Sequence, residues 1–351
     1  RRIFSRAASA IFPGRPVPAG GGMKTVKAVT RKACGSWRVL AAVAAVLCST
    51  TAAVLGASFT ETAVDDLALA VIGSLLVLAA LLLLVTAYLQ ADWAVGAVER
   101  YVPEVVWRIP TQLPLAALTI DDIPLLDNPS SLEEILDILG ENEVRATLFV
   151  MSGFDADVAE GGMEPGSRAR YKALLARAVA EGHELGNHMQ FDRPAIGMTH
   201  EEFDGSFHHC DALLADLAGG EKAWRDRPRR WFRPASAMWD GHILAAAREL
   251  GYTTVIANCF PFDTASATRL LNAPYLTRRV RPGAIVIVHD RWHTPATLRQ
   301  ALPLIAQRGL QLGTLSELQA AADAEAKASS GDTRSGSESS LSSDGFVGPQ
   351  E

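Results

Sequence analysis

Two adjacent carboxylates at the end of an apolar run are the residues of this chain best suited to chemistry. Asp121 and Asp122 follow an apolar run typical of a β-strand, residues 115–120, and Pro124 comes shortly after them. Burying two like charges side by side is unfavourable unless a metal ion or a nearby cation compensates them. Because neighbouring side chains of a strand point different ways, one carboxylate can bind a metal while the other acts on water. The pair therefore indicates a metal-dependent hydrolase.

A histidine and a third carboxylate could complete such a metal site. His188 and Asp192 follow a short apolar strand, and they are four residues apart. If the chain turns helical at this point, that spacing places both side chains on one face. Together with Asp122 they would give one imidazole and two carboxylates, which is an open three-ligand site for a divalent metal.

An arginine and a second histidine also end apolar strands. Arg233 stands in an apolar frame, where a buried guanidinium needs a carboxylate partner, and Asp121 is the obvious candidate. His289 ends the run at residues 283–288 and could act as a general acid or base near neutral pH. Adjacent strand residues face apart, so Asp290 is a poor partner for His289, and Asp263 is the better candidate to orient it.

Between about residues 110 and 320, strand patterns alternate with helical patterns. This alternation predicts an α/β domain with a mostly parallel sheet or barrel, in which catalytic residues gather at the carboxyl ends of the strands. The expected strands are Leu115–Ile120, Arg145–Met151, Glu184–Asn187, Trp231–Arg233, Thr253–Ala257, Ala284–Val288 and Leu310–Leu315. The expected helices are Ser131–Leu139, Arg168–Glu181, Thr199–Leu217, Gly241–Leu250 and Pro295–Gln307.

Five short motifs in this region resemble those of the polysaccharide deacetylases with a NodB-like domain, carbohydrate esterase family 4. The family's T-F-D-D-G-P is similar to T-I-D-D-I-P at 119–124, and its A-T-F-F-V strand to A-T-L-F-V at 146–150. G-H-E-L-G-N-H stands at 182–188, F-R-P at 232–234, and I-V-H-D at 287–290, in the family's order. The resemblance covers about residues 113–320.

The resemblance implies a fold and a reaction. The fold would be a distorted (β/α) barrel of the polysaccharide deacetylase type, preceded by hydrophobic helices. The reaction would be removal of N-acetyl groups, as acetate, from an N-acetylglucosamine-containing oligo- or polysaccharide such as chitin.

The resemblance also implies a role for each site residue. Asp122, His188 and Asp192 would bind the metal, which would polarise the acetyl carbonyl and hold the attacking water. Asp121 would be the general base, paired with Arg233. His289, oriented by Asp263, would protonate the departing amine.

The sequence departs from the family pattern at the metal site. The family usually has a second histidine where this chain has Asp192, and the carboxylate adds negative charge and favours harder metals. Zn²⁺ is still expected, with Mn²⁺, Fe²⁺ or Co²⁺ as alternatives. Two other readings stay open, namely a catalytically degenerate glycan-binding domain and an amide or cyclic-imide hydrolase on the same scaffold. The aromatic side chains that could stack on a sugar or fill the core are Trp231, Trp239, Trp292 and Phe262.

Two apolar runs precede this domain. Val39–Ala57 follows a basic segment, residues 1–38, and could be a signal peptide, a transit segment or a first membrane span. Leu67–Leu89 carries no charge and is long enough to cross a bilayer. We therefore expect one or two transmembrane helices within residues 39–91 and a membrane-anchored protein. The side of the membrane that the domain faces depends on whether one run spans or both do.

Composition sets the remaining expectations. The chain has 351 residues and a formal net charge of −6, which argues against a nucleic-acid partner. Residues 325–351 turn to Ser, Gly, Asp and Glu, and this predicts a disordered tail. Cys210 and Cys259 stand in no metal-binding spacing and are expected to be free, buried thiols.

Overall fold

A curled sheet of parallel strands forms the centre of the molecule. The structure is a computed structural model that describes residues 63–126, 129–155, 166–265 and 268–338. The strands pair in the order β1-β6-β5-β4-β3-β2-β7, and β8 pairs with the beginning of β2. Every pairing is parallel, which confirms the predicted α/β class and barrel-like sheet. The strands are β1 (Val105–Val106), β2 (Leu115–Ile123), β3 (Thr147–Val150), β4 (Glu184–Asn187), β5 (Trp231–Phe232), β6 (Thr253–Val255), β7 (Ile285–His289) and β8 (Gln311–Gly313).

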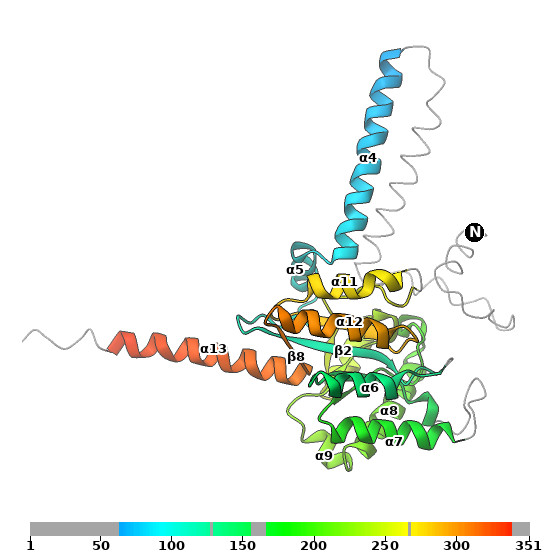
Figure 1. Cartoon of the computed structure of the whole chain (residues 1–351), viewed down its shortest axis with the longest axis vertical. Coiled ribbons are helices and arrows are strands. Elements are labelled where there is room, and N and C mark those ends of the chain that lie inside the picture. Colours follow the sequence, from blue (N-terminus) through cyan, green and yellow to red (C-terminus); the bar gives the residue numbers. More distant parts are fainter. Residues whose placement is uncertain (1–62, 127–128, 156–165, 266–267, 339–351) are drawn as a thin grey trace, which may run out of the picture. The chain divides into compact units, whose positions relative to one another are not determined.

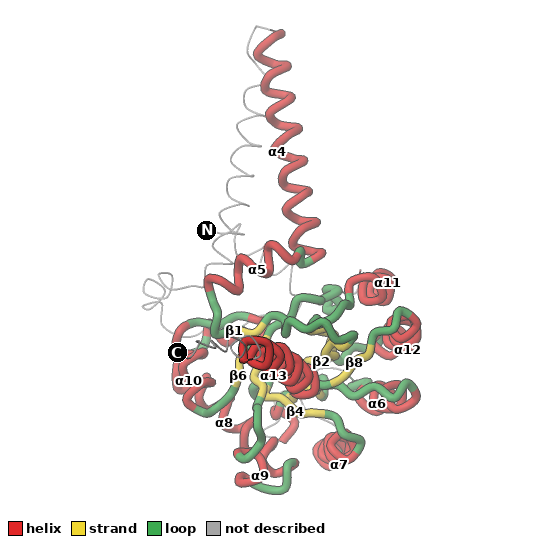
Figure 2. Tube along the Cα trace, turned by 90° about the vertical axis from the view of Figure 1, so that its left-hand side faces the viewer, coloured by secondary structure: helices red, strands yellow, loops and turns green. Residues whose placement is uncertain are grey.

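Helices cover the outer side of the strands, as Figure 2 shows for α6, α7 and α12. Each of these connects one parallel strand to a later one, because parallel neighbours require a crossover. The helices are α4 (Ala63–Leu89), α5 (Asp92–Tyr101), α6 (Leu132–Glu141), α7 (Ser167–Ala180), α8 (His200–Leu217), α9 (Glu221–Arg225), α10 (Gly241–Glu249), α11 (Arg269–Arg279), α12 (Thr294–Gln307) and α13 (Leu315–Glu338) (Figure 1).

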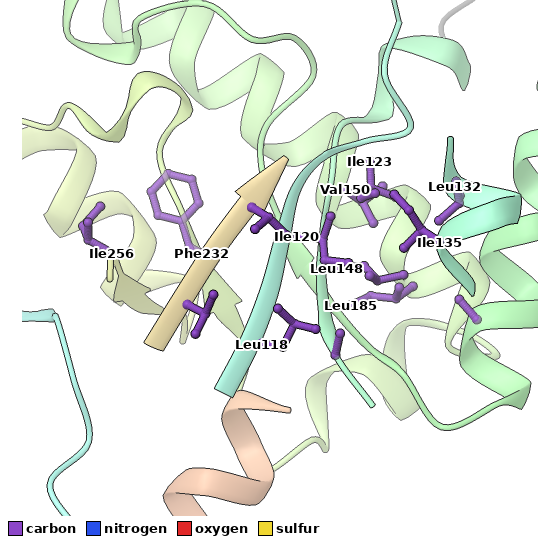
Figure 3. Close-up of a cluster of buried hydrophobic side chains, with 14 of the residues drawn as sticks. Leu118, Ile120, Ile123, Leu132, Ile135, Leu148, Val150, Leu185, Phe232 and Ile256 are labelled. Atoms are coloured by element: carbon purple, nitrogen blue, oxygen red, sulfur yellow. The ribbon is translucent and has the colours of Figure 1, made fainter. Parts of the chain in front are cut away.

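Alternation along the strands separates an outer core from the barrel interior. Leu118 and Ile120 of β2 belong to the outer core together with Leu148 and Val150 of β3, which point toward Leu132 and Ile135 of α6 (Figure 3). Burial on both faces explains why these strands are apolar without a break.

The barrel interior holds the residues of opposite parity. Ala117, Phe149, Trp231 and Ile287 pack there with the first turn of α13. A side chain at Gly186 would place its Cβ 2.7 Å from the Phe149 ring, so the absence of a side chain at that position leaves room for the aromatic filling.

Two features differ from the sequence expectations. Helix α11 was not predicted, since Pro274 stands inside it and two exposed leucines mask its periodicity. Helix α13 continues to Glu338, beyond residue 325, where composition predicts a disordered tail. Its Ala- and Glu-rich first half has high helix propensity, which the Ser count conceals. Residues 339–351 of that tail, and the apolar run Val39–Ala57, lie outside the described residues.

The second apolar run forms α4. Within the part of the chain that the structure describes, Val71–Leu89 is one helix long and apolar enough to cross a membrane, and none of it is buried. Such a helix near the beginning of a chain suits either an anchor or a signal sequence. Cys210 and Cys259 are free and buried, as expected.

Candidate active site

Strand parity brings three of the predicted residues to one place. Asp121 continues the inward positions of β2, Arg233 follows inward-facing Trp231, and His289 follows inward-facing Ile287. Asp121 and His289 are register partners across the β2–β7 pair. All three therefore lie at the carboxyl end of the barrel interior, where the sequence analysis expected them.

Asp121 and Arg233 form a buried ion pair. The Arg233 Nη1 atom donates to Asp121 Oδ1 at 2.5 Å and to Thr119 Oγ1 at 2.7 Å. The other guanidinium nitrogens donate to the carbonyl oxygens of residues 255 and 256. Arg233 also lies over the Phe149 ring, with 4.1 Å between its Cζ atom and the ring centroid. Its charge is thus matched by a carboxylate and its donors are satisfied, so Asp121 is held in one orientation.

Asp122 departs from the strand alternation, and this departure separates it from Asp121. Its φ is +59°, and the β2–β3 register shifts between Ile120 and Ile123. A left-handed backbone at a residue other than Gly is unfavourable, and it persists where the surroundings enforce it, often at functional sites. The turn directs Asp122 Oδ1 to His188 Nε2, 3.3 Å away.

The Asp122–His188 pair fits a divalent metal. His188 Nδ1 lies 2.7 Å from the carbonyl oxygen of Arg233, which fixes the proton on Nδ1 and leaves Nε2 to bind a cation. Two donors at about 2.1 Å from one tetrahedral ion lie about 3.4 Å apart, close to the separation found here. Burial opposes the ionised form of Asp122, but the hydrogen bond with His188 and the charge of His289 outweigh it and lower the pKa of Asp122. A cation at this position would therefore meet an ionised carboxylate.

Asp192 lies on a bend after β4, and residues 188–194 form no helix, so the helical turn on which the shared face of His188 and Asp192 depended is not present. Asn187 Oδ1 accepts the Met189 amide at 2.8 Å, and Met189 has a φ of +69°, so the chain forms an Asx turn at the point where a helix would begin. Desolvation and the negative charge of Asp122 raise the pKa of Asp192, so the two carboxylates repel each other when both are ionised.

Asp192 is not drawn into contact with the other two predicted ligands. Within the described residues, no three His, Cys, Asp or Glu side chains lie close enough together to hold a metal ion. The ligand role of Asp192 therefore stays a prediction.

His289 is paired with Asp263. The Asp263 carboxylate lies 2.8 Å from His289 Nδ1 through Oδ1 and accepts the His289 amide at 2.7 Å through Oδ2. Burial disfavours the cation, but the charge of Asp263 and its hydrogen bond outweigh burial and raise the pKa of His289 to about 9. Asp290 instead accepts the amides of Leu125 and Ser131, which leaves Asp263 to orient the ring.

Arg291 is a site residue that the sequence analysis missed. Its Nη2 atom donates to Asp122 Oδ2 at 2.7 Å, and its Nη1 atom donates to the Asp290 carbonyl oxygen at 2.9 Å. A signal was present, because Arg291 directly follows the His289-Asp290 pair. The Arg291 guanidinium therefore offsets part of the negative charge of the carboxylates around it, Asp122, Asp192 and Asp263.

The aromatic candidates divide into core and surface residues. Trp231 and Trp239 are buried, whereas 67% of Trp292 is exposed. Trp292 follows Arg291 in the chain, so it lies next to the site and could present its ring to a sugar.

Comparison with known proteins gives consistent similarities. A family model described as polysaccharide deacetylase matches residues 108–255. A peptidoglycan-N-acetylglucosamine deacetylase of Bacillus cereus is 28% identical over 223 residues, which cover 61% of this chain and 92% of that protein. A chitooligosaccharide deacetylase of Rhizobium leguminosarum bv. phaseoli is 31% identical over 196 residues, covering 51% of this chain and 69% of that protein.

Solved structures show the same fold. The Bc1960 peptidoglycan N-acetylglucosamine deacetylase aligns with a TM-score of 0.51 at 20% identity, covering 64% of this chain and 95% of that chain. PdaA of Bacillus subtilis, a family 4 carbohydrate esterase, aligns with a TM-score of 0.51 at 18% identity, covering 65% of this chain and 89% of that chain. At these identities the likeness concerns the fold.

Proposed function

Because the chain belongs to the polysaccharide deacetylase family, we propose that it removes N-acetyl groups from an N-acetylglucosamine-containing glycan and releases acetate. The relatives act on peptidoglycan or on chitooligosaccharides by their names, and both substrates carry this group. The observation that carries the proposal is the pairing at the barrel mouth. Asp121 forms an ion pair with Arg233, which favours the ionised carboxylate that a general base needs. His289 pairs with Asp263, which favours the protonated imidazole that a general acid needs.

The family is generally metal-dependent, and we propose that Asp122, His188 and Asp192 hold the ion in this chain, with Zn²⁺ preferred over Mn²⁺, Fe²⁺ or Co²⁺. When bound, a divalent ion supplies Lewis acidity to the acetyl carbonyl and a lowered pKa to water. Arg291 keeps its bond to the other oxygen of Asp122, so that carboxylate offers a single oxygen, Oδ1, on the His188 side.

The proton transfers fall to residues of the chain itself. Asp121 accepts a proton from the attacking water as its oxygen bonds to the acetyl carbon. Since His289 is mostly protonated below about pH 9, it can donate a proton to the amide nitrogen as the carbon–nitrogen bond breaks. The products are acetic acid, which loses its proton to water and leaves as acetate, and the free amine of the sugar; Asp121 ends protonated and His289 neutral.

We propose that α4 anchors the domain to a membrane. Its candidate span, Val71–Leu89, is uncharged and has no buried residue, whereas a core helix of a soluble protein would be buried. The substrate would then be a glycan that can reach a membrane-attached enzyme.

The test is acetate release by the full chain in detergent. Chitooligosaccharides and peptidoglycan fragments are supplied separately, each with one divalent metal at a time, and Asp121→Asn serves as the matched control. The proposal expects turnover of at least one substrate and a loss of at least about 100-fold in Asp121→Asn. No acetate release from either glycan under any metal would contradict the proposal. Glycan binding, measured in parallel, would then favour the degenerate, glycan-binding alternative, and hydrolysis of a cyclic imide supplied in a separate assay would favour the imide hydrolase.

A further inference from the structure

The chain leaving α4 is fastened to the domain. Tyr88, in the last turn of α4, stacks on Phe262 with ring centroids 5.6 Å apart and meets Tyr275 of α11 edge-on at 5.3 Å. The Gln90 side chain donates to the Phe260 carbonyl at 2.8 Å and accepts the Phe260 amide at 2.7 Å. These contacts hold the end of α4 against α11 and the loop before Asp263, so α4 is not a loose tether.

Exposed apolar side chains gather on the two helices at this junction. Outside α4, the large apolar residues that the described chain leaves most exposed include Trp93 (67%) and Tyr101 (87%) of α5, and Leu270 (78%) and Leu271 (54%) of α11. Such side chains are usually scattered singly over a soluble surface. Here they come in pairs on neighbouring helices, and Arg281 beyond α11 forms an ion pair with Asp92 at the start of α5.

The same helices carry exposed arginines at helical spacing. Arg100 is seven residues from Trp93, and Arg278 is eight from Leu270, so each arginine shares a face with an apolar residue. Helix α11 contains three arginines and no acidic residue. A helix with leucines and cations on its outer side suits the headgroup layer of an anionic bilayer. We call this set the α5–α11 surface: Trp93, Arg100, Tyr101, Leu270, Leu271 and Arg278.

We propose that the α5–α11 surface rests in the headgroup layer of the membrane that α4 crosses. Continuity selects a bilayer over a protein partner, because Tyr88 at the end of the span already contacts α11. Tyr88, Trp93 and Tyr101 are the residue types that favour the membrane–water interface. The inference rests on the proposed anchoring role of α4. Membrane contact of the α5–α11 surface would hold the loop that carries Asp263 close to the bilayer. The site would then be within reach of glycans that lie near the membrane.

Depth-dependent quenching tests this proposal on the full chain reconstituted in vesicles that contain phosphatidylserine. An environment-sensitive fluorophore is attached at Leu271→Cys or, as the matched control, at Leu304→Cys, an exposed leucine of α12 outside this surface. The chain without an added cysteine gives the background from the native thiols. We expect a lipid with a headgroup quencher to reduce the fluorescence at position 271 at least twofold more than at position 304, and less so when Arg278→Glu is added.

Equal quenching at positions 271 and 304 would overturn the proposal. So would shielding of position 271 from aqueous iodide without lipid quenching, because a protein partner would then cover it. Extraction of the chain from the vesicles by alkaline carbonate would overturn it as well, since α4 would not span. None of these readouts needs acetate release. Failure of the α5–α11 surface to bind the membrane and failure of the deacetylase proposal are therefore separate results.

Discussion

Replacing Asp263 with Asn should lower the pH at which the enzyme loses activity. The charge of Asp263 and its hydrogen bond are the main influences that raise the pKa of His289 from 6.5 to about 9, against the effect of burial. At 1.36 kcal/mol per pKa unit, this difference corresponds to about 3 kcal/mol of preference for the cation. Asn keeps an oxygen that can accept a hydrogen bond and removes the charge, so the pKa of His289 in Asp263→Asn should fall to about 6.5 or below.

The consequence for catalysis follows from the acid role of His289. At pH 8 about 90% of His289 is protonated with a pKa of about 9, but about 3% with a pKa of 6.5, so kcat/KM at that pH should fall about 30-fold. A bound metal ion would offset the negative charge of Asp122 and lower the pKa of His289 in both proteins. The difference in pKa between Asp263→Asn and the unmodified protein would remain. The assay is the pH dependence of kcat/KM for acetate release.

Asp290→Asn is the matched control, because the Asp290 oxygens face the amides of Leu125 and Ser131. In Asp290→Asn, kcat/KM should fall at the same alkaline pH as in the unmodified protein. Superimposable alkaline limbs for Asp263→Asn and the unmodified protein would refute the reasoning. Stability gives a second check, since a raised folded-state pKa contributes stability in full below about pH 6.5 and loses it as the pH rises through about 9.

Three further predictions concern the ion pair, the metal and the sugar. Arg233→Met leaves Asp121 buried without a partner and should lower the free energy of unfolding by about 3 to 5 kcal/mol in urea titrations in detergent, whereas adding Asp121→Leu should recover part of that loss. Asp192→Ala should reduce bound metal at least tenfold while the melting temperature of the metal-free protein stays unchanged, and unchanged metal content would remove Asp192 from the ligand set. Trp292→Ala should raise KM for oligosaccharides several-fold with little change in kcat, and an equal effect on a monosaccharide substrate would argue against stacking.

Strand parity explains why much of the site could be predicted from the sequence. Side chains two apart along a strand share a face, so Asp121, Arg233 and His289 fall on one side once their strands are recognised. The same rule excluded Asp290 as the partner of His289. Asp263, the candidate named in its place, is in contact with the ring.

Local backbone geometry explains what could not be predicted. The left-handed turn at Asp122 goes with a shift in the β2–β3 register, and the Asx turn at Met189 rests on a single hydrogen bond to the Asn187 side chain, so neither has a period in the sequence. The chain therefore bends where the shared face of His188 and Asp192 would have needed a helical turn. Arg291 belongs to no strand pattern. The hydrogen bonds between Gln90 and Phe260 join residues 170 positions apart, which no local pattern predicts.

The central claim is that this chain is a metal-dependent deacetylase, and metal titration of the full chain tests it most directly. Metal is first removed by chelation, then restored in steps, and acetate release from an N-acetylglucosamine oligosaccharide is measured beside metal bound per chain. We predict negligible turnover after chelation and a linear recovery that saturates at about one ion per chain. Full activity in the chelated protein, or no activity at saturation, would contradict the account.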